Sequence, residues 1–405
     1  MKDILIFTLR DLSKSGGGSI RINSLIRVFS QNRNVIVLSN NSSIEQTVHA
    51  EFDVRFNSFE KRIFQVLLCF LPVDIIRILF YGKLRRIEYL FQNYYSLDQD
   101  VIFCEHLDNS LGFYLKKRGI IKKSYINDVH GIASIELSKK IYQIPFVKSI
   151  VLYLAKRHEF KILSFASTII YPSVGMYNFF KDNYLSFRNL KAIIIPNLIS
   201  MDMLNSKLNI NFNKKLVVKY NIDTNKQIIF FAGGYKELGG IYDLISVFAI
   251  LLNKRKSNLL LLIVGDGFKQ EKVNKHIDDL NLSNHVIQLG RQPYDKLFSI
   301  QQLANVIVCP DRMNDYSNLI VHLKYFDSIV SGIPVVCSGF DSVRDINKIG
   351  SFSVLYPPSN LKEMLTAIEF CLENETQIKN SFLKKKHLIK KHLTYESYKD
   401  IFNNL

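Results

Sequence analysis

The chain has 405 residues, which is too long for one ordinary hydrophobic core and predicts two or three domains. With 47% hydrophobic and 22% charged residues, its composition is that of a globular protein and excludes a disordered chain. The formal net charge of +17 indicates an anionic partner, which a nucleic acid, an anionic membrane surface or a phosphorylated substrate would each provide.

Three features of the sequence narrow the possible partners and cellular locations of the protein. The sequence contains no zinc finger, no RNP-like aromatic motif and no basic zipper, so we expect no nucleic-acid partner. The five cysteines are scattered without a CxxC pair, which fits a reducing cytoplasm and argues against disulfides or structural zinc. The apolar run at the N-terminus is broken by Arg10 and Asp11, so it predicts a first strand and not a signal peptide.

The chain opens with a predicted strand, a glycine loop, a helix and a second strand, an order typical of a Rossmann-type unit. The strands are residues 4–7 and 34–39, and the loop SGGGS spans 15–19. Gly17 and Gly18 let the backbone approach a ligand and present N–H groups to an anion. The spacing is not GxGxxG, so a flexible surface turn explains the loop almost equally well.

Residues 58–95 are both apolar and basic. Gln65, Pro72, Asp74 and Arg77 interrupt the segment, so it lacks the run of about 20 apolar residues that a membrane span needs. Pro72 is expected to separate two helices. Two interpretations carry equal weight: an interfacial helix pair on anionic lipid, or core-packing helices whose cations reach solvent. The cations are Lys61, Arg62, Arg77, Lys83, Arg85 and Arg86.

Polar side chains follow two further predicted strands, at the carboxyl edge where α/β folds bind ligands. One strand ends at Glu105 and His106, and its DxD string precedes the strand, so we read that string as loop and predict no catalytic metal. The next strand ends at 128–131. His130 there can hydrogen-bond ligand hydroxyls and move protons near neutral pH. A purely structural histidine is the alternative, and Glu105–His106 is the weaker candidate.

The second half of the chain repeats the strand, glycine loop and helix pattern. Residues 201–226, rich in Asn and Lys, are expected to form a linker with a short helix. QIIFFAGG (227–234) is a strand that ends in Gly233 and Gly234, and LLLLIVGDG (259–267) is a buried parallel strand that ends in Gly265, Asp266 and Gly267.

The segment 306–336 predicts a strand, a loop, a helix capped by Ser317 and a second strand after Gly332. Lys324 and Asp327 fall on one flank of that helix. A carboxylate there can accept from ribose hydroxyls, and the helix start offers N–H groups to phosphate. The alternative is a surface ion pair between the two residues, and this segment alone favours it.

HLKYFDSIVSGIPVV (322–336) resembles the P-x-K-x-x-E-(six residues)-P-V-V segment of family 4 glycosyltransferases, which have the GT-B fold. The ordered series of AGG to GI, IVGDG and LGRQP resembles that family too, and the likeness covers nearly the whole chain. It implies an α/β fold of two Rossmann-like domains that face a central cleft. The implied divisions are an N-terminal acceptor domain (1–200), a linker (201–226), a donor domain (227–372) and a terminal helix (373–405) that crosses back.

The resemblance implies sugar transfer from a nucleotide-diphosphate sugar to a glycan or polyprenyl-linked acceptor. The reaction is expected to retain configuration, to need neither a metal nor a cofactor, and to serve bacterial surface polysaccharide such as capsule or O-antigen. The enzyme is expected in the cytoplasm, held peripherally by 58–95 at the inner face of the plasma membrane, whose anionic surface is a further expected partner.

The implied catalytic residues are His130 and Asp327. The implied donor-binding residues, besides Asp327, are Gly17, Gly18, Gly233, Gly234, Lys236, Gly265, Asp266, Gly267, Arg291, Ser317, Asn318 and Lys324. Residues expected at the acceptor or membrane are Glu105, His106, Glu136, Arg85 and Arg86.

The sequence departs from the family pattern at several of these positions. Asp327 stands where the family has Glu, and His322 replaces a Pro. Many retaining members carry an Arg and a Lys that contact the diphosphate where this chain has Gly234 and Gly239. Lys236, Arg291 and Lys324 are then the available cations. Two alternatives stay open: an epimerase or hydrolase of nucleotide sugars, and a non-catalytic scaffold subunit.

Overall fold

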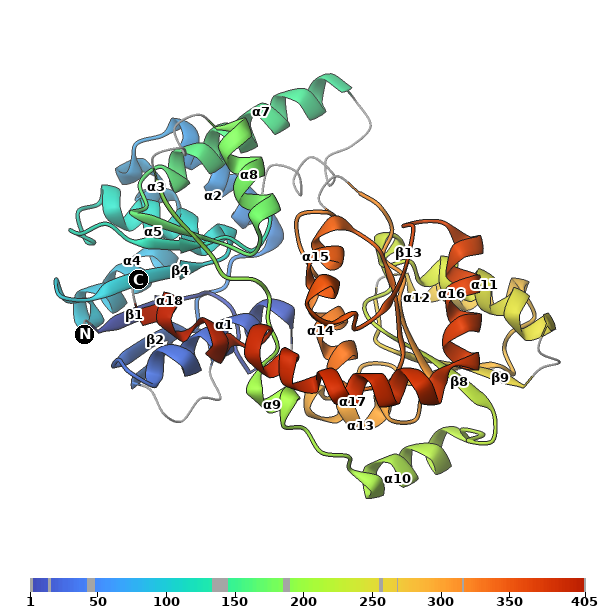
Figure 1. Cartoon of the computed structure of the whole chain (residues 1–405). Helices are drawn as coiled ribbons and strands as arrows, with labels where there is room; N and C mark the ends of the chain where they lie inside the picture. Colours follow the sequence, from blue (N-terminus) through green and yellow to red (C-terminus); the bar gives the residue numbers. More distant parts are fainter. Residues whose placement is uncertain are drawn as a thin grey trace. The chain divides into compact units, whose positions relative to one another are not determined.

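The computed structural model describes residues 3–13, 16–41, 48–132, 145–184, 190–254, 258–267, 269–314 and 317–403. The chain divides into two compact units (Figure 1), one formed by Met1–Pro196 with Tyr398–Leu405 and the other by Asn197–Ser397. Each unit contains one parallel sheet with helices packed against it, and we describe each unit by itself.

The first unit is built on a seven-stranded parallel sheet in the order β3-β2-β1-β4-β5-β6-β7. All four residues of the predicted first strand are buried, as expected for a central strand covered on both faces. Its strands are β1 (Ile4–Phe7), β2 (Val35–Ser39), β3 (Val48–Glu51), β4 (Asp100–Cys104), β5 (Ile126–Asp128), β6 (Thr168–Tyr171) and β7 (Lys191–Ile194). Its helices include α1 (Gly17–Ser30), α5 (His106–Lys117), α7 (Pro145–Leu163), α8 (Val174–Asn183) and α18 (Lys399–Asn403).

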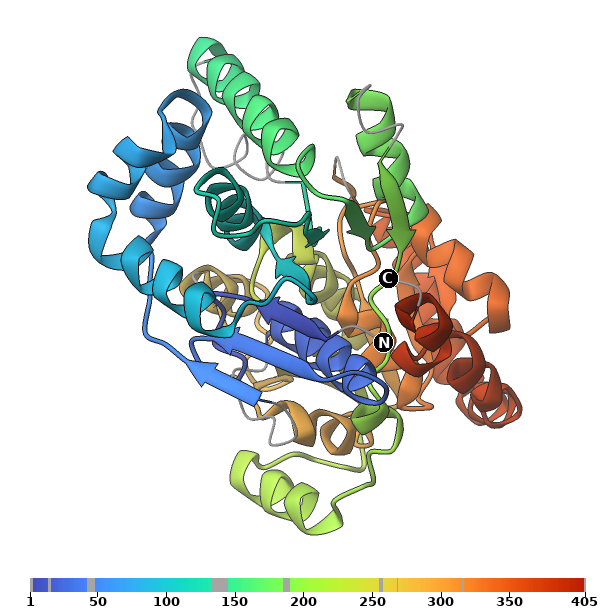
Figure 2. The ribbon, with the colours of Figure 1, turned by 90° about the vertical axis from the view of Figure 1, so that its left-hand side faces the viewer.

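The apolar, basic segment forms three helices, α2 (Ser58–Phe70), α3 (Val73–Leu79) and α4 (Tyr81–Tyr94), drawn in blue in Figure 2. Asn57 and Glu60 form a capping box that starts α2, and Pro72 separates α2 from α3 as predicted. One face packs into the core through Phe64, Leu68, Ile76, Leu84 and Ile87. Other large apolar side chains of the segment, such as Phe59 and Ile78, are exposed. Core packing is therefore confirmed for part of the segment, and binding to anionic lipid stays a prediction.

The second unit is built on a six-stranded parallel sheet in the order β10-β9-β8-β11-β12-β13. Its strands are β8 (Gln227–Ala232), β9 (Leu259–Val264), β10 (Val286–Gln288), β11 (Val306–Cys309), β12 (Val335–Ser338) and β13 (Val354–Tyr356). Its helices include α11 (Ile241–Lys254), α12 (Gln270–Asp279), α13 (Leu297–Gln301), α14 (Leu323–Val330), α15 (Asp341–Gly350), α16 (Leu361–Glu373) and α17 (Glu375–His392).

The segments expected as linker and as terminal helix are more integrated than predicted. Residues 201–226 contain α9 (Met201–Leu204) and α10 (Ile210–Tyr220), which bury Met203 and Leu216 in the core of the second unit. The long helix α17 also packs on the second unit, through Phe382 and Ile389. The chain rejoins the first unit only at Tyr398.

Both sheets reverse their strand order at a defined point. The first unit switches between β1 and β4, and the second between β8 and β11, because the chain continues outward in opposite directions from these strand pairs. In doubly wound sheets, ligands bind beyond the carboxyl ends of the strands at such a switch point. The fold therefore indicates one candidate site in each unit.

Candidate active site

The glycine loop closes the switch point of the first unit. Helix α1 begins at Gly17, and Gly18 lies directly against the side chains of Glu105 and Arg10. A Cβ atom at Gly18 would overlap the Glu105 carboxylate and would lie 2.8 Å from Cζ of Arg10. The close approach gives Gly18 a defined packing role, so the alternative of a flexible surface turn is wrong for this residue.

Three charged side chains meet beside Gly18. The Arg10 guanidinium forms a short ion pair with Glu105, which lies just past the end of β4 with a φ of 82°. A positive φ is uncommon for a residue other than glycine, so the strand-to-helix turn holds Glu105 in a restricted conformation. Nδ1 of His130 lies 3.7 Å from Oε1 of the same carboxylate. The structure thus brings together Glu105 and His130, which sequence analysis placed on separate strand ends.

The buried ion pair between Arg21 and Asp128 holds His130 in position. Nε2 of His130 lies 2.6 Å from Oδ2 of Asp128. Arg21, on α1, donates to both carboxylate oxygens of Asp128, from Nε at 3.0 Å and from Nη2 at 2.8 Å. Its Nη1 donates to the carbonyl oxygens of Ile195 and Pro196 at 2.9 and 3.0 Å. Arg21 therefore joins the base of the site to the last residues of the first unit.

This arrangement favours the protonated form of His130. Burial by itself would lower the pKa of His130, but the Asp128 carboxylate and then Glu105 raise the pKa above its ordinary value. Burial would raise the pKa of Glu105, yet His130 and Arg10 lower that pKa to about 2. The pKa of Asp128 is also lowered against the effect of burial, first by Arg21 and then by His130. An imidazolium held between two carboxylates donates hydrogen bonds and is a poor proton acceptor.

The other predicted acceptor residues do not all lie in this group. His106, next to Glu105 in the sequence, is the first residue of α5 and lines a small cavity of about 20 Å³ with Asn109, His158 and Glu159. Glu136 lies outside the described residues. Arg85 and Arg86 are exposed on α4.

Glycine loops also line the switch point of the second unit. Gly233 and Gly234 follow β8, and the turn of Gly265, Asp266 and Gly267 follows β9, where the Asp266 carbonyl accepts from the Tyr235 N–H at 3.1 Å. Gly240, just before α11, has a φ of +70°, and a Cβ there would overlap the Pro310 carbonyl. This loop reaches the residues that follow β11 only because position 240 has no side chain.

Two predicted phosphate-binding cations lie at this edge. Nζ of Lys324, on α14, pairs with Oδ1 of Asp311 at 2.7 Å, and both side chains are largely buried. Burial would lower the pKa of Lys324, but Asp311 raises it, so the ammonium stays charged. Lys236, on the loop after β8, is exposed and makes no ion pair with the described part of the chain.

The charges of both lysines act on one neighbouring residue, His322. It is the residue before α14, and desolvation lowers its pKa, opposed by Asp311 and assisted by the charges of Lys324 and Lys236. The same histidine therefore lies within electrostatic reach of both ammonium groups. No side chain caps the start of α14, which directly follows His322. Together the two lysines and the helix start make this edge attractive to an anion.

The helix that carries Lys324 begins later than predicted, and the prediction that Ser317 caps it is wrong. Ser317 Oγ instead accepts from the Asn314 N–H at 2.8 Å and donates to the Arg312 carbonyl at 3.1 Å, so it stabilises the preceding loop. Asn318 accepts from the N–H of Asp341 at the start of α15.

The alternative interpretation, an ion pair between Lys324 and Asp327, is wrong. Lys324 pairs with Asp311, whereas Oδ1 of Asp327 accepts from the Tyr294 hydroxyl at 2.6 Å. Asp327 is only 7% exposed, and burial raises its pKa to about 7, with the Tyr294 hydrogen bond acting in the opposite direction. The third sequence-predicted cation, Arg291, forms an exposed ion pair with Asp266 at 3.1 Å.

Sequence analysis missed four residues that hold these sites in place. Tyr294 and Arg312 act in the second unit, where Arg312 forms a bidentate pair with Asp243 on α11. Arg21 and Asp128 act in the first unit. The only sequence signal was an arginine at a position of α1 that is otherwise buried and apolar, together with the acid two residues before His130.

Comparison with known proteins identifies the chemistry. Residues 212–390 match the family described as glycosyl transferases group 1. The chain is a glycosyltransferase, and residues 212–390 are the part that is similar to this family. An uncharacterised glycosyltransferase of Methanocaldococcus jannaschii is 21% identical to it over 367 residues, which cover 88% of this chain and 87% of the relative. The prediction of a glycosyltransferase is confirmed.

Solved structures show the fold of this glycosyltransferase. Sucrose-phosphate synthase from Thermosynechococcus elongatus superposes with a TM-score of 0.72 at 14% identity, over 100% of this chain and 98% of that one. WaaG, a glycosyltransferase involved in lipopolysaccharide biosynthesis, gives 0.68 at 12% identity, over 99% and 100%. Anabaena HepE in complex with UDP and glucose gives 0.69 at 14% identity, over 100% and 99%. The predicted α/β fold of two Rossmann-like domains is confirmed.

No helix among the described residues is sufficiently long and apolar to cross a bilayer. Within the same residues, no three His, Cys, Asp or Glu side chains gather as a metal site would require. Metal independence of the glycosyltransferase stays a prediction.

Proposed function

We propose that this glycosyltransferase takes its sugar from a nucleotide-diphosphate sugar held by the second unit and transfers it to a glycan or polyprenyl-linked acceptor. The observation that carries this proposal is the position of Lys324, whose Nζ pairs with Asp311 just after β11 and lies 5.5 Å from the centre of the Phe231 ring on β8, the strand that Lys236 follows. Anabaena HepE, whose structure was solved in complex with UDP and glucose, supports a nucleotide-sugar donor.

The charges suit a leaving diphosphate. When the bond between the sugar and the diphosphate breaks, negative charge grows on the departing oxygen, and fixed positive groups lower the energy of that state. Lys324 is held in place by Asp311, so it costs little reorganisation, and exposed Lys236 is free to close on the phosphates. These lysines and the backbone N–H groups take the place of the Arg and Lys that the family pattern leads one to expect at Gly234 and Gly239.

The first unit is proposed to orient the reacting sugar and the acceptor. The His130 ring is positioned by Asp128 and Glu105, and Arg10 and Gly18 contact the same Glu105 carboxylate. In its protonated form, which these carboxylates favour, His130 donates a hydrogen bond to a sugar or acceptor oxygen. The bond between the sugar and the diphosphate breaks, the acceptor hydroxyl oxygen forms the new bond to the sugar, and its proton passes to the departing diphosphate.

Asp327 is proposed to hold the nucleotide ribose, as the resemblance implies. Its buried side chain and its bond to Tyr294 fix the turn of α14 that follows Lys324, so the residue also positions that helix. Binding of the nucleotide would then depend on the Asp327 carboxylate and on the geometry that Tyr294 imposes on it.

The product is proposed to be a bacterial surface polysaccharide, made with retention of configuration and without a metal at the inner face of the plasma membrane. The involvement of the structurally similar WaaG in lipopolysaccharide biosynthesis supports this assignment. So does the face of α2–α4, where exposed apolar side chains lie beside cations.

The first experiment is calorimetric binding of UDP, GDP and CMP in the presence of EDTA, to the wild type and to Asp327→Ala. Tyr294→Phe is the matched variant, because it removes the hydrogen bond and keeps the carboxylate. We expect one nucleotide to bind with micromolar affinity, Asp327→Ala to abolish that binding, and Tyr294→Phe to weaken it. If no nucleotide binds the wild type, the proposed donor site is overturned.

A second assay separates transfer from hydrolysis or epimerisation of the donor. The nucleotide that binds is supplied as its sugar conjugate, with and without a lipid-linked acceptor. We expect donor consumption to require the acceptor. Equal consumption without it would favour the hydrolase or epimerase.

A further inference from the structure

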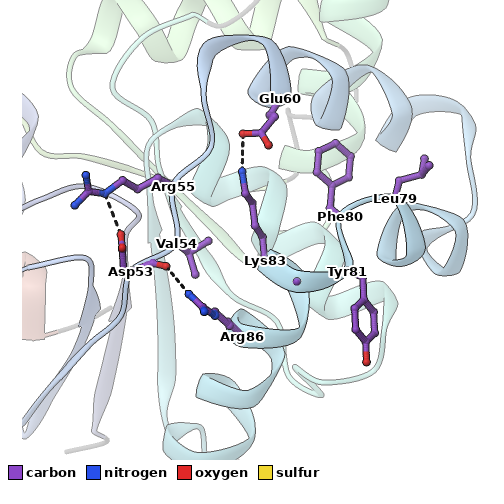
Figure 3. A pocket seen from close by; sticks show the side chains of 10 residues that line it. Asp53, Val54, Arg55, Glu60, Leu79, Phe80, Tyr81, Lys83 and Arg86 are labelled. Atoms are coloured by element: carbon purple, nitrogen blue, oxygen red, sulfur yellow. Dashed lines mark hydrogen bonds and ion pairs between the residues drawn. The ribbon is translucent and has the colours of Figure 1, made fainter.

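The first unit contains a second pocket, of about 510 Å³, that neither the glycine loop nor His130 lines (Figure 3). It lies between the segment that follows β3 and the junction of α3 with α4. Its walls combine cations with apolar groups, and the residues that matter are Arg55, Glu60, Leu79, Phe80, Lys83 and Arg86.

The pocket has an excess of positive charge. Lys83 pairs with Glu60 at 2.5 Å, and its ammonium lies 4.9 Å from the centre of the Phe56 ring. Arg55 pairs with Asp53 at 2.9 Å, with both side chains more than 70% exposed. Arg86 has no carboxylate among these partners, and its Nη1 donates to the Asp53 carbonyl at 3.1 Å. Three cations therefore face two carboxylates, which favours one bound anion.

The rim of the pocket is apolar and exposed. At the junction of α3 with α4, Ile78 is 73% exposed, Leu79 is 58% exposed and Tyr81 is 47% exposed. We call Ile78, Leu79 and Tyr81 the apolar tip. Leu79 and Tyr81 also line the pocket, so the apolar tip and the cations are parts of one surface. Apolar side chains beside cations are the combination that binds an anionic bilayer, since the first enter the acyl boundary and the second meet the headgroups.

The pocket also lies at the edge of the sheet formed by the carboxyl ends of its strands. Residues 53–55 follow the carboxyl end of β3, as His130 follows that of β5, and all seven strands are parallel. The Asn40 side chain ties this wall to the first site, because its amide nitrogen donates to the carbonyls of Leu9 and Val54 and its oxygen accepts from the Val54 N–H. A bilayer at the pocket would therefore face the same sheet edge as His130.

We propose that this pocket binds the phosphate headgroup of an anionic phospholipid, with Ile78 and Leu79 inserted among the acyl chains. The inference rests on the proposed function, because an acceptor linked to polyprenyl must be met at the membrane. It goes further by assigning a specific headgroup site to Lys83 and Arg86. General attraction between a basic protein and a charged surface would need no such site.

The experiment is co-sedimentation of the full chain with vesicles of phosphatidylcholine alone, and of phosphatidylcholine with phosphatidylglycerol. The variants are Arg86→Ala and Arg85→Ala, which remove equal charge from neighbouring exposed positions of α4. Only Arg86 lines the pocket, whereas Arg85 bonds to the Tyr81 hydroxyl. We expect Arg86→Ala to lower affinity for the anionic vesicles about five-fold or more, and Arg85→Ala to lower it clearly less.

Each outcome has a distinct meaning. Equal loss in the two variants, both folded by circular dichroism, overturns the headgroup site and leaves general electrostatic attraction. If the wild type binds neutral and anionic vesicles equally, membrane docking by this face is overturned as well, while nucleotide binding still tests sugar transfer independently. If glycerol phosphate raises the melting temperature of the wild type but not of Arg86→Ala, and vesicles bind both alike, the pocket takes a free anion and not a lipid.

A second pair of variants tests the apolar tip. Ile78→Ser removes an apolar side chain that is 73% exposed, and Val218→Ser, on α10 of the second unit, removes one that is 82% exposed. We expect only Ile78→Ser to weaken vesicle binding. Equal binding by the wild type and Ile78→Ser would overturn insertion of the tip.

Discussion

Arg21 and Asp128 form a bidentate ion pair in which both side chains are at most 2% exposed. Oδ2 of Asp128 accepts from Nε of Arg21 at 3.0 Å and faces Nε2 of His130 at 2.6 Å, so a single oxygen joins the pair to the candidate active site. Because Arg21 also donates to the carbonyls of Ile195 and Pro196, one guanidinium fixes both the histidine and the end of the first unit.

Removal of Arg21 should destabilise the first unit severely. Arg21→Met leaves the Asp128 carboxylate buried without its partner, which typically costs about 3–5 kcal/mol. The measurement is urea unfolding followed by circular dichroism. Arg291→Met is the control, because the Arg291–Asp266 pair is exposed and such pairs contribute about 0–1 kcal/mol. Equal losses in the two variants would contradict a structural role for the buried pair.

The charge of His130 should make stability depend on pH. Its pKa is raised in the folded state, so the stabilisation is fully present below the ordinary pKa of 6.5 and is lost as the pH rises through the folded-state pKa. We expect the difference in unfolding free energy between wild type and His130→Gln to be largest below pH 6.5 and to shrink above it. NMR titration of the ring should show a lower pKa in Asp128→Asn. An unchanged pKa in that variant would remove Asp128 as the cause.

Asp327 should give a pH dependence of the same sign as His130, because its pKa is also raised on folding. Its pKa of about 7 lies above the ordinary value of 3.8, so the folded state binds the extra proton and wild-type stability falls as the pH rises from 3.8 to 7. Asp327→Asn cannot ionise and keeps an oxygen for Tyr294. Between pH 4 and pH 8 we expect the unfolding free energy of this variant to rise by about 4 kcal/mol relative to that of the wild type. A pH-independent difference in thermal unfolding would refute the raised pKa.

Lys236 should contribute to binding of the diphosphate and not to folding. It is exposed, with its charge near His322 and Lys324, so Lys236→Ala should weaken UDP, or the nucleoside diphosphate that binds, about five- to tenfold, which is about 1–1.4 kcal/mol. The corresponding nucleoside lacks phosphates, and its binding should not change. Lys215→Ala, exposed on α10, is the matched control. Calorimetry that gives both variants the same nucleotide affinity would exclude Lys236 from the site.

Gly240 and Gly290 offer a matched test of the close approach to β11. Both have positive φ, +70° and +65°, but only a Cβ at 240 meets another group, the Pro310 carbonyl. Gly290→Ala should cost the conformational penalty of about 1–2 kcal/mol. Gly240→Ala should cost more than that and should weaken nucleotide binding, since the loop must move. Equal melting temperatures for the two variants would show that the loop relaxes freely.

Several elements of the fold follow from local patterns. ILIF at β1 and LLLLIV at β9 are continuous apolar runs, which only strands buried on both faces require. Pro72 predicted the boundary of α3 because it lacks an N–H, and Gly332, with a φ of +76°, ends the α14 region as expected. Such features are legible in the sequence because their causes act within a few residues.

The sequence alone thus determined the two sheets, the glycine loops and the residues that follow each strand. Only the tertiary structure decided their partners. Lys324 bonds to Asp311 and not to Asp327, because residues distant in sequence lie side by side at the sheet edge. In the sequence, Arg21 is one cation among many in a basic chain. The packing of α1 places it against Asp128, which is 107 positions away. Periodicity sets which face of an element is buried, whereas the packing of non-adjacent elements sets which charges meet, and that packing depends on the whole core.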